Sequence, residues 1–322
     1  MGNSLSAEIL INWFKLTLVK NGLGPVKIMK LLNYFNDIKT IFNASTSDLL
    51  QSQLVTTKMV DNLSKLKNAS NENFYELIKI CKMNDIEIIP LIDSRYPRKL
   101  KNISNAPLTL YAKGNLNLLS EEIPKIGVVG TRSPSDIAKR YAYDVSKKLC
   151  NYSLTLISGG ALGVDTAAYK GALESKNSQA IVILGAGILR PYPPENRELF
   201  DEIIKRNGLL ISENTPNFTG TKISYVQRNR IISGLADSIY LVAANSKGGG
   251  FQQVKIAYSQ RKPIFVPNIN KNILPNEGVK RAIAEFEARE LENTEDILKQ
   301  VPKYSTLLKV SSQTHTVENA LF

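Results

Sequence analysis

A short loop at 130–132 combines residue types and spacing that bind phosphate. Gly130-Thr131-Arg132 follows an apolar run at 126–129 and precedes Ser133 to Asp136, which offer helix-capping side chains. A strand, a tight turn and a helix N-terminus aim backbone N–H groups and a positive helix dipole at one point. The Arg132 guanidinium adds a planar, permanently charged group that binds phosphate bidentately. A plain turn with a solvated arginine fits the same residues.

Further glycine loops follow other apolar runs. They lie at 158–163, at 185–187 and at 248–250, and Asp165 comes two residues after the first of these. The carboxyl ends of parallel strands share one edge of a sheet, and open α/β sheets bind ligands there. Convergence of three glycine loops on one edge is a stronger indication of a binding site than any single loop.

An Arg-Asn-Arg run provides a second cationic group. Arg228, Asn229 and Arg230 stand at the start of an expected helix, directly before apolar Ile231 and Ile232. Two arginines that flank an amide can bind phosphates or bases. They can equally form salt bridges with acidic neighbours and stabilise the fold.

Strands and helices must alternate to hold these loops. Strand-like apolar runs lie at 126–129, 154–157, 180–184, 209–212, 239–243 and 264–266. Apolar residues 137, 141, 145 and 149 are expected on one face of a helix that follows the first run. Strands that are apolar throughout predict a parallel sheet with helices on both faces, that is, an α/β fold. The last of these runs is expected to close the series.

The N-terminal 75 residues predict a small helical domain. A first amphipathic helix carries Trp13 and Phe14, and Pro25 suits the first position of a second helix after the Gly22–Gly24 turn. Such a turn is typical of a helix-hairpin-helix, whose amides can bind a DNA phosphate, although a bundle that only packs is equally compatible. The chain from about 278 is expected to be helical and charged, with a polar tail after about 302.

Composition limits the possible classes of function. The 322 residues carry 41 Lys and Arg against 29 Asp and Glu, a net charge of +12, which favours polyanions, first nucleic acid and then anionic lipid. Lysines scattered over the surface would give the same total. No apolar run approaches the roughly 20 residues of a membrane span, and no signal-peptide pattern opens the chain. Two cysteines and one histidine argue against a disulfide framework, a serine-histidine triad or a metal site, and fit a cytoplasmic protein.

An ordered set of motifs resembles the DNA-processing protein A family (DprA, also called Smf). The set is GTRSPS, SGGALGVDTAAYKGAL, ILGAGILRPYPPEN, GLLISE and QRNRIISGLADSIYLV, together with upstream DSRYPRKLKNISNAPLTLYAKG and GLGPVKIMKLL. The resemblance implies an extended Rossmann-like domain at 76–290, a helical domain of SAM or helix-hairpin-helix type at 1–75, and a tail at 291–322 without a complete winged-helix domain. It also implies a homodimer that is not an enzyme, protects incoming single-stranded DNA and loads the recombinase RecA in natural transformation.

The resemblance also implies a set of DNA-binding residues. The family's motifs fall on Gly130, Thr131 and Arg132, on Ser158, Gly159, Gly160, Gly163 and Asp165, and on Arg228, Asn229 and Arg230. Some positions depart from the family pattern. Tyr169 replaces a common histidine, and Tyr225-Val226 replaces Phe-Pro. The AANSKGGGFQQVKIA segment keeps its glycines but loses an acid and hydroxyls, and its Lys247 can supply a new phosphate contact.

Two enzyme classes are alternatives to DNA binding. A nicotinamide dehydrogenase would need glycine in place of Ser158 and a ribose-binding acid where Gly185 stands. The stronger alternative is a nucleotide-binding protein or nucleotide N-glycosidase like the phosphoribohydrolases, which use a glycine loop with a downstream glutamate. Here Gln252 and Gln253 follow the loop, and glutamine cannot act as a general base.

Overall fold

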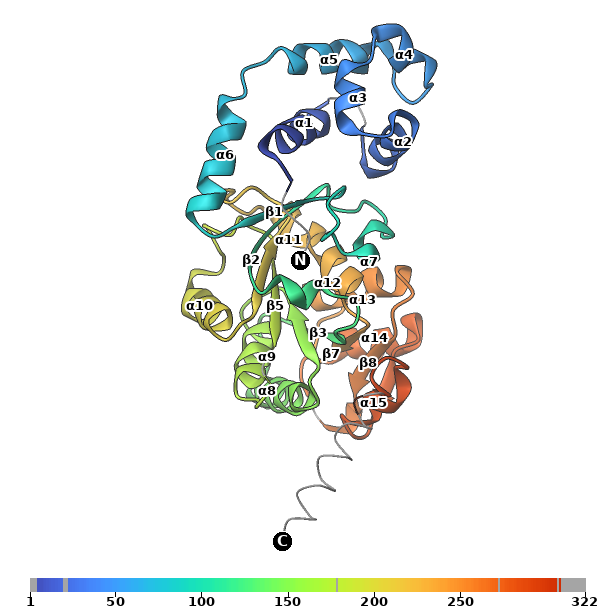
Figure 1. Ribbon diagram of the computed structural model, residues 1–322. Coiled ribbons are helices and arrows are strands. Elements are labelled where there is room, and N and C mark those ends of the chain that lie inside the picture. Colours follow the sequence, from blue (N-terminus) through green and yellow to red (C-terminus); the bar gives the residue numbers. More distant parts are fainter. Residues whose placement is uncertain (1–4, 20–22, 178, 272, 306, 308–322) are drawn as a thin grey trace, which may run out of the picture. The chain divides into compact units, whose positions relative to one another are not determined.

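The computed structural model describes residues 5–19, 23–177, 179–271, 273–305 and 307 (Figure 1). The chain forms two compact units, of which the first comprises Met1–Tyr96 and Ser104–Tyr111 and the second Pro97–Ile103 and Ala112–Phe322. The first unit runs further along the chain than the predicted helical domain at 1–75. The predicted domain boundaries stay a prediction.

The first unit is mainly helical. Its helices are α1 (Ala7–Thr17), α2 (Pro25–Phe35), α3 (Ile38–Asn43), α4 (Thr46–Gln51), α5 (Thr57–Lys67) and α6 (Glu72–Met83), followed by strand β1 (Glu87–Pro90) and the first half of β2 (Thr109–Gly114). Trp13 of α1 is completely buried, and its indole N–H donates to Thr109 Oγ1 at 2.9 Å. The amphipathic first helix and Pro25 at the start of α2 are confirmed. Gly22 of the predicted turn lies outside the described residues.

Side chains cap the start of α4 and the end of α5 in the first unit. Ser45 and Asp48 form a capping box that starts α4. Lys15 of α1 is buried, and its ammonium donates to the carbonyls of Lys67 and Ala69 at 3.0 and 3.2 Å. These carbonyls at the end of α5 would otherwise lack partners. The buried lysine therefore joins α1 to α5.

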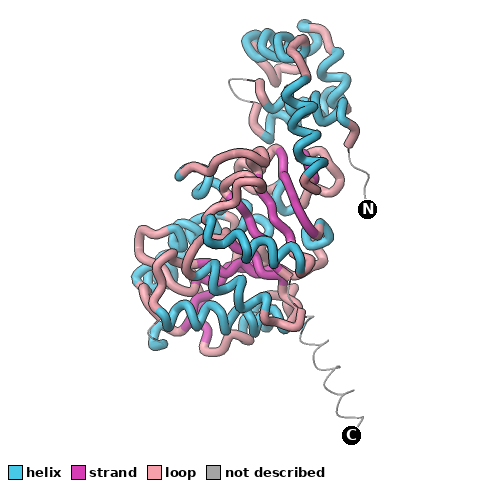
Figure 2. Tube along the Cα trace, turned by 90° about the vertical axis from the view of Figure 1, so that its left-hand side faces the viewer, coloured by secondary structure: helices cyan, strands magenta, loops and turns pink. Residues whose placement is uncertain are grey.

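The second unit is built on a parallel sheet with helices on both faces, as predicted (Figures 1 and 2). Seven strands pair in the order β6-β5-β4-β3-β7-β8-β9, and all six pairs are parallel. The strands are β3 (Lys125–Val129), β4 (Thr155–Ser158), β5 (Ala180–Leu184), β6 (Leu209–Ser212), β7 (Ser238–Leu241), β8 (Ile264–Pro267) and β9 (Arg289–Leu291). The helices are α7 (Arg98–Lys101), α8 (Asp136–Asn151), α9 (Val164–Leu173), α10 (Arg197–Lys205), α11 (Lys222–Gln227), α12 (Asn229–Leu235), α13 (Gly249–Ser259), α14 (Glu277–Phe286) and α15 (Asp296–Gln300), and short 3₁₀ turns lie at Leu116–Leu119, Pro194–Asn196 and Ile269–Lys271.

The strand order explains the two helical layers. From β3 the chain moves through β4 and β5 to β6 on one side, then crosses to β7 and continues outward to β9. Crossovers between parallel strands are right-handed. The helices that connect strands added on one side of β3 therefore lie on the opposite face from those that connect strands added on the other side. Thus α8, α9 and α10 cover one face, whereas α12, α13 and α14 cover the other (Figure 1).

Two details of the predicted elements are wrong. The predicted apolar face of α8 included residue 137, but Ile137 is 56% exposed, and Ala138, Ala142, Val145 and Leu149 are the buried set. A four-residue step advances 400° around a helix, so the predicted set drifts by about 40° at each step. The charged C-terminal region also contains a strand, β9, so β8 does not close the sheet. Its three residues are too short to show a periodic pattern.

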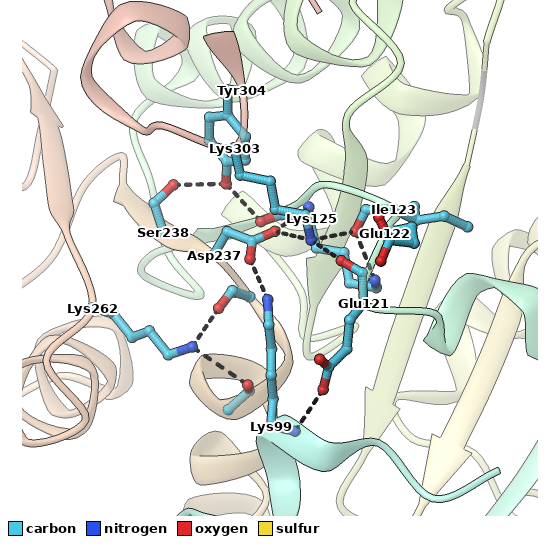
Figure 3. Close-up of polar contacts among 12 residues, drawn as sticks. Lys99, Glu121, Glu122, Ile123, Lys125, Asp237, Ser238, Lys262, Lys303 and Tyr304 are labelled. Atoms are coloured by element: carbon cyan, nitrogen blue, oxygen red, sulfur yellow. Dashed lines mark hydrogen bonds and ion pairs between the residues drawn. The ribbon is translucent and has the colours of Figure 1, made fainter. Parts of the chain in front are cut away.

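Four lysines surround one carboxylate at the amino ends of β3 and β7 (Figure 3). They are Lys99, Lys125, Lys262 and Lys303, and the carboxylate is Asp237. Lys99 and Lys303 form ion pairs with Asp237, the second at 3.2 Å. Lys125 and Lys262 instead donate to main-chain carbonyls, among them Ile123 O and Ala236 O at 2.8 and 2.7 Å.

The same cluster holds the end of the described chain. Tyr304 is completely buried, and its hydroxyl donates to Lys125 O at 2.6 Å and lies 3.0 Å from Ser238 Oγ. Lys303 beside it donates to Ile123 O at 3.1 Å. These bonds join the segment after α15 to the starts of β3 and β7.

Burial of like charges changes the titration of these lysines. Burial, together with repulsion from Lys303 and Lys99, lowers the pKa of Lys125 to about 7, while attraction to Asp237 and Glu121 opposes this shift. Burial lowers the pKa of Lys262 to about 8 for similar reasons. Both ammonium groups therefore lose protons more easily in the folded than in the unfolded chain.

Within the described ranges, none of the helices has both the length and the apolar character that a membrane span requires.

We expect Lys125 to contribute a rise in the stability of the protein with pH from about 7 towards 10. Between the folded pKa of about 7 and the ordinary value of 10.5, the unfolded chain binds more protons at Lys125 than the folded chain does. Stability increases with pH wherever the unfolded state binds more protons. Lys125→Met should remove a slope of up to about 1.4 kcal/mol per pH unit, measured by denaturant unfolding at several pH values.

Lys170→Met is the matched control, since Lys170 is exposed on α9 and lies outside the lysine cluster. Equal dependence of stability on pH for Lys125→Met and the wild type would contradict the lowered pKa of Lys125.

Candidate nucleic-acid interface

A cleft of about 420 Å³ opens at the carboxyl ends of β3, β4 and β7. β4 and β7 flank β3, and the chain leaves β3 towards one of them and later returns to the other. Open α/β sheets bind ligands at such a reversal of strand order. The lining residues are Val129, Gly130, Thr131, Arg132, Ala161, Asp165, Lys222, Tyr225, Val226, Arg228, Asn229, Ile232, Gly248, Gly249, Gly250, Gln252 and Gln253.

Three glycine loops meet at this cleft, as the sequence predicts. The Thr131 N–H donates to Ala243 O beyond β7 at 2.8 Å, and the Val164 N–H donates to Thr131 O at 3.1 Å. A Cβ atom placed on Gly250 would lie 3.0 Å from the backbone of Gly130. The loops after β3, β4 and β7 therefore touch through their main chains. The 185–187 loop does not line the cleft.

Gly163 holds the second loop against the first. Its φ of +85° belongs to a region that side chains rarely adopt. A Cβ atom there would lie 2.5 Å from Thr131 O and 2.6 Å from Arg132 O. Both the backbone angle and the close approach require glycine, so Gly163 shapes the loop that carries Arg132.

Arg228 lies buried against the backbone of Gly159. A Cβ atom on Gly159 would be 1.7 Å from Nη1 of Arg228, so the guanidinium occupies the space that a side chain would fill. Nη1 donates to Ile183 O of β5 at 2.6 Å, whereas the buried Nε has no hydrogen-bond partner among the described residues. Burial lowers the pKa of Arg228, and the nearby Asp165 carboxylate opposes this shift.

Asp165 accepts the amides of its own loop. The N–H groups of Gly159 and Ala161 both donate to Oδ2 at 3.2 Å. Burial raises the pKa of this carboxyl, while Arg228 and these hydrogen bonds oppose the rise. These two amides are thus engaged within the loop, and Asp165 contributes the negative charge that faces Arg228.

The accessible charges of the cleft are positive. Arg132 and Lys222 are exposed, and the buried Arg228 adds a third cation. Neither Arg132 nor Lys222 forms a side-chain hydrogen bond or ion pair with another described residue. Asp165 is the single carboxylate among the lining residues. This balance of charge suits an anion.

The structure separates the predicted site residues into two groups. Gly130, Thr131, Arg132, Asp165, Arg228 and Asn229 line the cleft, and Gly159 lines a small adjoining hollow. Ser158, Gly160, Gly163, Arg230 and Lys247 do not line either space. Arg230 instead forms a bidentate pair with Glu213 at 2.7 and 2.6 Å, and Lys247 is exposed in the turn before α13.

Some lining residues were absent from the predicted set. Lys222 is the first residue of α11. Gln253 belongs to α13, and its side-chain amide donates to Asn229 O at a distance of 3.0 Å. The glycine run at 248–250 marked the second of these segments in the sequence. No sequence signal separates Lys222 from the other lysines. Within the described ranges, no group of three or more His, Cys, Asp or Glu residues could hold a metal ion.

The sequence of this chain matches a known family. The profile of the family described as DNA recombination-mediator protein A matches residues 87–302. The chain belongs to this family. Within it, the chain is 30% identical over 268 residues to DNA processing protein DprA of Bacillus subtilis, which covers 81% of this chain and 89% of the relative. It is 30% identical over 259 residues to protein Smf of Synechocystis, which covers 80% of this chain and 64% of that relative's length.

Solved structures of recombination-mediator protein A relatives share the architecture. DNA processing protein A of Streptococcus pneumoniae aligns with a TM-score of 0.74 at 25% identity, over 93% of this chain and 99% of that one. The Helicobacter pylori protein, whose structure concerns its single-stranded DNA binding mode, aligns with a TM-score of 0.59 at 27% identity, over 70% of this chain and 96% of that one.

Tyr169, expected from the sequence to replace a histidine that is common in the family, lies behind the cleft. Tyr169 is completely buried, accepts the Ser158 N–H at 2.8 Å and donates to Ile181 O at 2.7 Å. The hydroxyl therefore connects β4 to β5. Tyr225, the other aromatic residue that is expected to differ from the family's pattern, lines the cleft.

Gly163→Ala should destabilise the protein by more than the about 1–3 kcal/mol that a strained backbone costs. The added methyl also clashes with two main-chain oxygens, so the loop must move. Gly249→Ala is the matched control, because nothing lies within 4 Å of its Cβ position. It should stay within about 1 kcal/mol of the wild type. Denaturant unfolding measures both, and equal stability of the two variants would contradict the required geometry at Gly163.

Proposed function

We propose that the chain binds single-stranded DNA in the cleft. One observation carries this proposal. Arg132 and Lys222 are exposed in the cleft and have no side-chain partner among the described residues. They lie beside the buried Arg228, and the lining of the cleft contains one carboxylate. Cationic side chains that contact phosphates supply the sequence-independent part of nucleic-acid affinity. Membership of the recombination-mediator family and the described DNA binding of the H. pylori relative support the same conclusion.

The shape of the cleft favours a single strand. A hollow of about 420 Å³ has room for a nucleotide but not for the width of a duplex. Tyr225 at its rim offers a ring on which an unpaired base can stack. Phosphate contacts and stacking tolerate every base, so little sequence preference is expected.

The finer role follows from the family. We propose that the protein acts in the cytoplasm as a homodimer, protects incoming single-stranded DNA and loads RecA onto it during transformation or recombination. The family description as a recombination mediator and the DNA-processing names of the bacterial relatives support this role.

The glycosidase alternative has weaker support. Glycoside hydrolysis commonly uses a pair of carboxylates. Asp165 is the single carboxylate in the lining and is engaged with two backbone amides, while Gln252 and Gln253 follow the third loop. Incubation with nucleoside monophosphates would detect release of a free base if the alternative were correct.

Arg132→Ala should weaken binding to labelled oligo-dT by about 1.5–3 kcal/mol, the value of a charged hydrogen bond. The slope of log affinity against log salt should become shallower by about 0.7 for each phosphate that the variant no longer binds. Fluorescence anisotropy at several salt concentrations measures both. Arg140→Ala is the control, because Arg140 is exposed on α8 and pairs with Asp144 at 2.9 Å outside the cleft. Wild-type affinity and slope for Arg132→Ala would place the DNA site elsewhere.

The wild-type protein should accelerate RecA ATP hydrolysis on single strands coated with single-strand-binding protein, because loading exposes the strand to RecA. Arg132→Ala should reduce this acceleration in proportion to its weaker DNA affinity, while Arg140→Ala retains it. DNA binding without acceleration would restrict the function to strand protection.

A further inference from the structure

A second, larger hollow adjoins the cleft and is named here the basic groove. Its volume is about 810 Å³. It is lined by Leu189, Arg190, Pro191, Tyr192, Pro194 and Arg197 from the segment after β5, by Thr219, Gly220, Lys222 and Tyr225 near α11, and by Arg132. Among the residues on which the family's DNA-binding motifs fall, Arg132 alone lines this groove.

The charge of the basic groove is entirely positive. Arg132, Arg190, Arg197 and Lys222 line it, and its lining contains no Asp or Glu. Arg190 and Arg197 are exposed, and no side-chain hydrogen bond or ion pair joins either of them to another described residue. Elsewhere on the described surface, arginines such as Arg206 and Arg281 pair with acids at 2.8 and 2.6 Å. Two unpaired guanidinium groups in one hollow are therefore available to an anionic ligand.

The backbone beneath these arginines is firmly held. The N–H groups of Gly187 and Leu189 donate to the carbonyls of Phe218 and Pro216, both at 2.9 Å. Asn196 is buried, and its side-chain amide donates to Gly160 O at 2.9 Å. The groove is thus connected to the second glycine loop, and its arginines project from an ordered support.

Two tyrosines stand where the cleft meets the groove. Tyr225 lines both spaces, as do Arg132 and Lys222. The rings of Tyr192 and Tyr225 are 5.5 Å apart between centroids and inclined by 42°. Tyr192 is 52% exposed. An aromatic pair flanked by cations is the arrangement that binds the bases and phosphates of a single strand.

We propose that the basic groove binds a second segment of the same single strand. The strand leaves the cleft, passes over Tyr192 and Tyr225, and places phosphates against Arg190 and Arg197. Tyr192 stacks on a base of the strand where it passes from the cleft into the groove. A base that is paired and stacked inside a duplex is not available for this contact. This inference rests on the proposed function. It extends the length of single strand that the protein contacts, and it explains why the protein would prefer unpaired strands to a duplex.

The test compares labelled oligo-dT of about 2 nucleotides, which is close to the length for which the cleft has room, with labelled oligo-dT of about 20 nucleotides, which exceeds the usual site sizes of single-strand binders. The Arg190→Ala/Arg197→Ala variant should bind the long oligonucleotide at least about tenfold more weakly and reduce its salt slope by about 1.4, the value for two phosphates. Its affinity for the short oligonucleotide, which the cleft alone accommodates, should stay within about twofold of the wild type. Tyr192→Leu should also weaken only the long oligonucleotide, by about fivefold or more.

The control is Lys170→Ala/Lys205→Ala, which removes the same charge from exposed positions outside the groove, the second of them on α10 with Arg197. Unchanged thermal unfolding confirms that each variant folds. Wild-type binding of the long oligonucleotide by the arginine variant would overturn the groove and leave the cleft intact. An equal loss for both lengths would also overturn it. Failure of the wild type to bind either oligonucleotide would overturn the proposed function itself.

Discussion

The buried guanidinium of Arg228 is the interaction on which the cleft depends. Removing a charge from water costs several kcal/mol unless other groups compensate for it. Here the compensation comes from the Asp165 carboxylate and the Ile183 carbonyl, and the space comes from the missing side chain of Gly159. A glycine and an aspartate of one loop must therefore be kept together with an arginine that is distant in sequence. The unpaired Nε leaves one hydrogen-bond donor of this group unused by the described chain.

The sheet could be predicted closely from the sequence because its strands are buried on both faces. β5 and β6 coincide with the apolar runs at 180–184 and 209–212, and Ser135 caps α8 within the expected stretch. The glycine loops at 130, 158–163 and 185–187 could be located for the same reason, since they directly follow strands or the last residue of one. What failed was local. Ile137 is apolar but exposed, and β9 is too short to show a pattern.

The separate roles of the site residues could not be predicted, because they depend on partners distant in sequence. Arg132 and Arg230 look equivalent in the sequence, but Glu213 lies beside only the second of them. Gly163 and Gly249 also look alike, although only the first has a positive φ and a crowded Cβ position. Net charge misleads in a similar way. Lys125 and Lys262 count among the 41 basic residues, but burial lowers their pKa values to about 7 and about 8, so they add less to the surface field than exposed lysines do.

The hydrogen bonds of Tyr304 determine which edge of the sheet residues 303–305 occupy. Tyr304 is bonded at the amino ends of β3 and β7, whereas the cleft lies at the carboxyl ends of the same strands. A strand of five residues spans roughly 15 Å, so the two places are separated by the full depth of the sheet. A fluorophore attached at position 305 would therefore lie at the edge of the sheet opposite the cleft, where bound DNA would not touch it.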